Sequence, residues 1–215
     1  RPDFRNHNPG FTFGGPVVKN KLFFFTAYEY DNIQEDTVVD AWVPVTTGNP
    51  NFTLPAPTNP AGAVNVTSTF NGVPVTVAVA PYIEPFPTPA KKHIFTARAD
   101  WNINDSQNIT FSYQMGRSDD LRNFSGTNRI GNSLIGRIRN TDGYNFTHNW
   151  VITPQVVNQF RFQYSTLRPR SEQAAGANAP AVLVTFVPPG ESSTTQVFGS
   201  TTSSSDRIED RWQFQ

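Results

Sequence analysis

Short segments that alternate apolar and polar residues dominate this chain, and they are joined in turn by short and by long connections. The clearest segment is 108–116, NITFSYQMG, in which every second residue is apolar and the residues between are mostly polar. Successive side chains of a strand point to opposite faces, so this period of two predicts a strand with one apolar and one polar face. Helical periodicity is almost absent. The fold class predicted is therefore all-β and antiparallel.

Pairs of such segments predict β-hairpins at about 10–30, 93–116 and 144–167, and a further strand begins in 207–215. The turns inside these hairpins are only a few residues long, and one carries Asn-Asp-Ser turn chemistry. The connections between the hairpins are long, at about 32–92, 117–140 and 168–206. Long structureless loops are uncommon in compact soluble domains. Alternating short turns and long loops are typical of a transmembrane β-barrel built as an up-and-down meander, with the long loops outside.

The long connections contain some predicted structure. Segments 64–70 and 73–79 flank Asn71-Gly72, which is the strongest two-residue hairpin signal, so we expect a surface hairpin there. Pro74 must then lie at an unpaired position or at an edge, because it has no N–H to donate. We also expect a short strand at 182–187 and a mobile tip at 199–205, GSTTSSS.

Trp101 and Trp150 both precede a short turn and therefore lie at the same end of the predicted sheet. This is the place of an interfacial aromatic belt, because an indole has an apolar body and a polar tip. Packing in the core of an ordinary β-sandwich is the alternative explanation. Strand residues on the other parity are polar, and they either line a lumen or form a solvated outer face. The charged members of this polar set are Glu29, Arg98, Asp100, Arg161 and Arg211.

Composition excludes several classes of function. Lys plus Arg and Asp plus Glu both count 17, so the net charge is zero and the basic footprint of a nucleic-acid-binding protein is missing. There is no Cys, which excludes thiolate catalysis and Cys-ligated metal sites. The three histidines, His7, His93 and His148, are scattered, and we find no catalytic, metal-binding or cofactor-binding pattern. We expect no enzyme, and a glycosidase is the least favoured hypothesis because paired carboxylates are lacking.

Three motifs resemble a known family. The first is the run from Phe13 to Phe25, FGGPVVKNKLFFF, followed by Ala27-Tyr28-Glu29. The others are the pair FTARADW and FSY, at 95–101 and 111–113, and the stretch from Thr153 to Phe162. Together they resemble the first barrel hairpins of TonB-dependent outer-membrane receptors. The closest subgroup is the Oar-like kind, which carries an N-terminal carboxypeptidase-regulatory-like domain.

This resemblance implies a 22-stranded barrel that encloses a plug domain, located in the cell outer membrane. The implied partners are outer-membrane lipid, the plug and remaining strands of the same protein, and the TonB complex through that plug. The implied ligand is scarce and bulky, such as a metal chelate, cobalamin or a glycan. We expect residues 1–215 to be the N-terminal part of such a barrel, within a longer protein. A secreted β-sandwich adhesin or carbohydrate-binding module is the alternative function.

Under the receptor hypothesis, the external loops contact the ligand first. Aromatic residues in the first loop are the candidate contacts, with packing of loop against loop as the alternative role. These candidates are Trp42, Phe52, Phe70, Tyr82 and Phe86.

Overall fold

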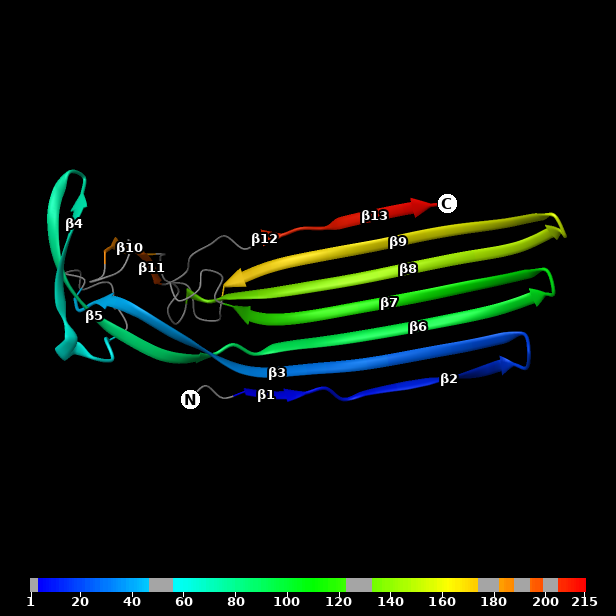
Figure 1. Cartoon of the computed structure of the whole chain (residues 1–215), viewed down its shortest axis with the longest axis horizontal. Helices are drawn as coiled ribbons and strands as arrows, with labels where there is room; N and C mark the ends of the chain where they lie inside the picture. The colour runs from blue at the N-terminus through cyan, green and yellow to red at the C-terminus, as the bar shows by residue number, and fades with distance from the viewer. Residues whose placement is uncertain (1–3, 47–55, 123–132, 174–181, 188–193, 199–204) are drawn as a thin grey trace.

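The computed structural model describes residues 4–46, 56–122, 133–173, 182–187, 194–198 and 205–215, and strands make up most of them (Figure 1). The elements in chain order are β1 (Phe4–His7), β2 (Gly10–Val18), β3 (Leu22–Pro44), the 3-10 turn η1 (Pro60–Gly62), β4 (Val64–Phe70), β5 (Val73–Pro87), β6 (Ala90–Asn104), β7 (Gln107–Arg122), β8 (Ile135–Thr153), β9 (Val156–Gln173), β10 (Val182–Phe186), β11 (Thr194–Phe198), β12 (Ser205–Asp206) and β13 (Glu209–Phe214). No helix in these described ranges is long and apolar enough to cross a membrane.

The strands form an antiparallel meander, which confirms the predicted fold class. An 11-stranded sheet runs in the order β12, β9, β8, β7, β6, β3, β5, β4, with β1 and β2 also paired to β3 and β13 paired to β9. The two-stranded sheet of β10 and β11 is separate. Figure 1 shows β2, β3 and β6 to β9 side by side, with their short turns at one end and the longer connections at the other.

Each hairpin turn has a local cause. Asn20 adopts a positive φ of 61° between β2 and β3, a conformation that Asn tolerates better than most residues. Between β6 and β7, the Asn104 side-chain oxygen accepts hydrogen bonds from the backbone N–H and the hydroxyl of Ser106, at 3.0 and 2.9 Å. In the third turn the Gln155 N–H donates to the Thr153 hydroxyl at 3.3 Å. Such side-chain bonds fix a tight turn and hence the strand register.

β3 belongs to two parts of the sheet. Its first half pairs with β6, from Leu22 opposite Trp101 to Ile33 opposite Ala90. Its second half pairs with β5, from Asp36 opposite Pro87 onward, and the register continues unchanged. β5 ends at Pro87, and Pro89 lies in the gap before β6; neither proline can donate to the ladder. We call the second half of β3, together with β5 and β4, the external sheet.

The strands run further than the predicted hairpin limits, so the long connections are shorter than we predicted. β7 continues to Arg122, β8 begins at Ile135 and β9 ends at Gln173. The added residues of β7, RSDDLR at 117–122, are mostly polar on both parities. A strand exposed to water on both faces has no period-two signal, because backbone pairing alone holds it in the sheet.

The predicted surface hairpin is present as β4 and β5, with Asn71 and Gly72 at positive φ of 50° and 80°. Pro74 lies where β5 pairs only with β4, so its missing N–H faces an edge, as predicted. The expected strand at 182–187 is β10, which pairs with β11. Residues 199–204 of the expected mobile tip lie outside the described residues.

The buried core of the described chain lies in the external sheet. Val39, Ala41 and Val43 of β3 are buried, as are Val79, Ala80 and Tyr82 of β5. Leu134, just before β8, and Ile135, its first residue, are buried as well. By contrast, large apolar side chains on β2, β6, β7, β8 and β9 are exposed. The long hairpins therefore present an apolar surface that no described element covers.

A pair of adjacent glycines in β2 tests the close packing of the first hairpin. A Cβ on Gly14 would lie 2.8 Å from the Phe24 carbonyl oxygen, whereas a Cβ on Gly15 would meet nothing within 4 Å. We expect Gly14→Ala to destabilise the folded protein by about 1–3 kcal/mol, because the backbone of β3 must shift. Gly15→Ala should be neutral or slightly stabilising. Urea unfolding in lipid vesicles measures both, and equal effects would contradict the packing argument.

Candidate membrane-facing surface and ligand loops

Strand register divides the large sheet into two chemically different faces. On one face, a row of aligned residues crosses six strands and is mostly phenylalanine, and we call this face the apolar face. The row comprises Phe24, Ala99, Phe111, Phe146, Phe162 and Phe214. Residues one position along each strand belong to the opposite face, which we call the polar face. Period-two alternation predicted this division.

A row of aromatic rings crosses the apolar face on the side away from the short turns. Tyr113, Tyr144, Tyr164 and Trp212 are aligned on neighbouring strands. Their ring centroids lie 4.9, 6.0 and 4.1 Å apart in that order. We did not predict this row from the sequence. The available signal was an aromatic residue on the apolar parity of each strand, at the same distance from the turn.

The tyrosine hydroxyls point away from the phenylalanine row. Tyr113 donates to Asp142 at 2.6 Å, and Tyr164 donates to Asp210 at 2.9 Å. Both carboxylates lie two residues further from the short turns along their strands, on the same face. The ring of each tyrosine therefore lies next to the phenylalanine row, and its hydroxyl points toward the charged residues beyond it. A side chain at a membrane interface is oriented in the same way.

Charged side chains follow directly beyond the aromatic row. Arg117 binds both carboxylate oxygens of Asp142, at 2.8 and 2.9 Å, and donates to the carbonyls of Gly116 and Thr141. A paired and hydrogen-bonded charge of this kind belongs at a headgroup or water boundary, because burial in hydrocarbon is costly. The aromatic row therefore marks one limit of the apolar face.

Trp101 and Trp150 lie on the apolar face near the short turns, where the sequence placed them. They are 48% and 38% exposed. The Trp150 ring stacks on His148 at 6.4 Å. Their role as a second interfacial belt, at the opposite limit of the apolar face, stays a prediction.

The polar face carries a network of amides, hydroxyls and ion pairs. Arg98 donates to both oxygens of Asp100, and Thr110 donates to the same carboxylate at 2.8 Å. Nearer the turns, Asn149 donates to Asn108 at 2.8 Å. Gln159 in turn donates to Asn149 at 2.6 Å. In such a network, neighbouring side chains supply hydrogen-bond partners to one another, so the polar groups need fewer hydrogen bonds to water.

The other charged residues predicted for this network are placed on the same face but less tightly joined. Glu29 accepts a hydrogen bond from Asn8 at 3.0 Å. Arg211 borders a hollow of about 870 Å³ on the polar face. Gly116 and Gly143 also line this hollow, together with amide, hydroxyl, carboxylate and apolar side chains. Arg161 borders a smaller hollow of about 140 Å³.

Phe23 and Phe25 break the alternation. Both lie on the polar face, opposite Asp100 and Arg98 of β6, and both are exposed. A Cβ on Gly14 would lie 3.3 Å from the Phe25 ring, so this glycine provides room for the ring on that face. Nothing in the described chain explains why two apolar rings lie here.

Of the five predicted loop aromatics, the described ones, Trp42, Tyr82 and Phe86, are not brought together. Trp42 is half-buried on β3, and the register places it on the opposite face of the external sheet from Tyr82 and Phe86. Tyr82 is only 3% exposed, which places its ring in the core, and its hydroxyl donates to Glu84. Phe52 and the side chain of Phe70 lie outside the described residues. Ligand contact by these residues stays a prediction, although the burial of Tyr82 favours packing at that position.

The environment of Tyr82 changes its acidity. Burial of the ring, together with the hydrogen bond to the Glu84 carboxylate, raises the pKa of Tyr82 well above its usual range. The phenol stays neutral in the folded protein under alkaline conditions in which an unfolded chain would ionise it.

A family model described as an outer membrane beta barrel domain matches residues 1–213 of the chain. No curated protein and no solved structure matches the chain.

Adjacent residues of β7 test which face meets lipid. Phe111 lies in the phenylalanine row, and Ser112 lies on the polar face. We expect Phe111→Lys to destabilise the protein in lipid vesicles by about 2–4 kcal/mol, because a charge then enters hydrocarbon. Ser112→Lys should cost less than about 1 kcal/mol. Urea titrations of the two variants decide the matter, and a larger loss for Ser112→Lys would reverse the assignment of the faces.

Tyr82→Phe tests the core of the external sheet. Near pH 8 the wild type should be more stable by about 1 kcal/mol, because the variant leaves Glu84 without its donor. The folded pKa of Tyr82 is raised, so its stabilising effect is complete below the unfolded pKa of about 10 and falls as the pH rises above that value. The advantage of the wild type at pH 8 should therefore vanish and then reverse by pH 11.5, because ionisation of the unfolded chain removes about 2 kcal/mol over that interval. An unchanged gap would contradict this account.

Proposed function

The chain belongs to the outer membrane beta barrel domain family, and from this premise we propose that it forms part of the barrel of a TonB-dependent receptor. It lies in the outer membrane as barrel wall. We propose further that this wall takes part in the uptake of a scarce ligand, such as a metal chelate, cobalamin or a glycan. Within these receptors we propose the Oar-like subgroup, which the motifs of the first hairpins resemble.

One observation carries the proposal: a sheet that is apolar on one face and polar on the other, with no second sheet over its apolar face among the described strands. A sandwich adhesin would bury that face against a second sheet. In a barrel the apolar face meets lipid and the polar face lines the lumen. The alternative of a secreted β-sandwich module is therefore not supported.

The receptor assignment within barrels rests on the sequence of the first hairpin and on the long external connections. The segment FGGPVVKNKLFFF forms β2, its turn and the start of β3. Figure 1 shows the external sheet at the end of the strands opposite the short turns, where we propose that a ligand arrives first. The polar face then offers amide, hydroxyl and guanidinium groups along the lumen that it lines.

Closure needs further strands. β2 pairs only with β3, and β13 pairs only with β9, within the described chain. Unpaired backbone groups are not tolerated in hydrocarbon, so both edges need partner strands. We propose that these are the remaining barrel strands of the same protein, and that a plug domain inside the barrel contacts the TonB complex.

Uptake in cells tests this function. The complete protein is expressed in a Gram-negative host, and accumulation of labelled ferric chelates, cobalamin and oligosaccharides is measured with and without TonB. We expect one probe to bind at the cell surface in both strains and to accumulate only when TonB and the proton gradient are intact. Accumulation that is independent of TonB would indicate a passive pore and contradict the proposal.

A further inference from the structure

The first external connection is unusual in its charge. No Asp, Glu, Lys, Arg or His occurs between Asp40 and Glu84. The stretch includes all of β4 and most of β5, and alternates Val with Thr, Ala and Asn. Charged residues are the usual means of keeping exposed strands apart, so this hairpin lacks that protection.

The hairpin of β4 and β5 is a well-defined ribbon. Asn71 and Gly72 both have positive φ, which matches the type I′ turn that suits a two-residue hairpin. The register runs without a shift from Val64 opposite Val79 to the turn. On one face, the hydroxyls of Thr67 and Thr76 lie 3.0 Å apart across the two strands.

Most of this ribbon has only two strands. β3 reaches β5 as far as Val79 opposite Pro44, and the Val45 N–H donates to the Ala78 carbonyl, so residues 73–77 of β5 pair with β4 alone. Val73 and Val75 are 61% and 41% exposed. A two-stranded ribbon in water is marginally stable, and a third strand is the usual remedy.

The two edges of the ribbon differ in their capacity to accept that strand. On the β5 side, Pro74 removes a donor and blocks the ladder. The β4 side contains no proline, no charge and no register shift, and β4 is the last strand of its sheet in the part of the chain that is described. β10 approaches β4, but its ladder partner is β11. The β4 edge is therefore the one that can accept a strand.

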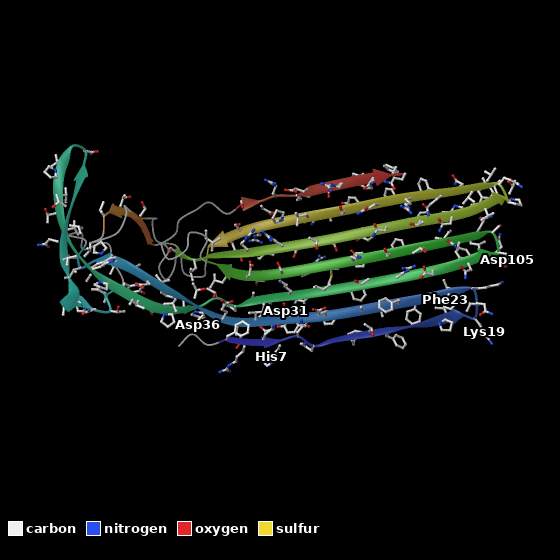
Figure 2. All side chains as sticks on the ribbon, viewed as in Figure 1. His7, Lys19, Phe23, Asp31, Asp36 and Asp105 are labelled. Carbon is white, nitrogen blue, oxygen red and sulfur yellow. The ribbon has the colours of Figure 1, made fainter. Side chains whose placement is uncertain are left out.

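We propose that β4 pairs antiparallel with β4 of a second copy of the protein, about a two-fold axis midway between the two Thr67 residues. This places Thr67 opposite Thr67 of the second copy and extends the row on one face to four threonines. Threonine pairs are favourable across strands, and an uncharged strand meets no like-charge repulsion from its own copy. Figures 1 and 2 show the hairpin turned across the direction of β6 to β9, at the end of the sheet away from the short turns.

The absence of Cys gives a clean test, because Thr67→Cys introduces the single thiol of the chain. The full protein is oxidised with copper phenanthroline in outer-membrane vesicles, and dimers are read by immunoblot. Directly opposite residues have Cβ atoms within about 5.5 Å, close enough for a disulfide after a small adjustment. Thr76→Cys is the matched control, because two such residues would lie three strand spacings apart, about 14 Å. We expect at least about a fivefold excess of dimer for Thr67→Cys.

A charge pair of variants provides the second measurement. Thr67→Lys sets two like charges opposite each other and should convert the dimer to monomer in detergent, by light scattering after size exclusion. Thr76→Lys, on the same face but one strand inward, should leave the dimer intact. A monomeric wild type, or equal crosslinking of the two cysteine variants, would overturn the proposal. Neither result bears on TonB-dependent uptake, which is tested separately.

Discussion

Backbone pairing is the constraint on which this structure depends. Hydrocarbon offers no hydrogen-bond partner, so every N–H and C=O in a membrane-spanning strand must find one on a neighbouring strand. The ladders of β6, β7, β8 and β9 meet this demand with a single register through the phenylalanine row. Their register shifts fall at Asn102 to Asn104 and at Val151 to Thr153, beside the short turns. Irregular pairing is thus confined to the end where water is available.

Once the backbone is satisfied, the two faces can differ freely. The apolar face is graded along its length, from tryptophan near the turns, through phenylalanine, to tyrosine and then to the ion pair of Arg117 and Asp142. Each step follows the polarity profile of a bilayer. The polar face shows no such gradient, because amides and hydroxyls continue from the turns to the outer end. The difference between the two faces is what distinguishes a membrane wall from a half-buried soluble sheet.

Strands with two unlike faces were predictable from the sequence, and so were their turns. Alternation around Phe111 and the Asn71-Gly72 pair each gave the correct local structure. The outer parts of β7, β8 and β9 were missed because a polar strand in water leaves no period in its sequence. The tyrosine row was missed because it arises from register between strands, which no single segment contains. The burial of Tyr82 also depends on how its strand pairs with neighbouring strands. The sequence around Tyr82 therefore could not distinguish it from an aromatic residue on the surface.

The unbroken register of β3 limits how the external sheet can change during evolution. A single inserted residue between Asp31 and Asp36 would turn every later side chain of β3 to the other face, because side chains alternate with a period of two. Val39 and Val43 would leave the core, and Asp40 would enter it, while the membrane-facing half stayed intact. Tolerated changes of length in this region should therefore come in pairs, or fall beyond Pro44. The barrel wall and the external sheet can diverge in composition. Both, however, depend on the register of β3, so its length between them must be conserved.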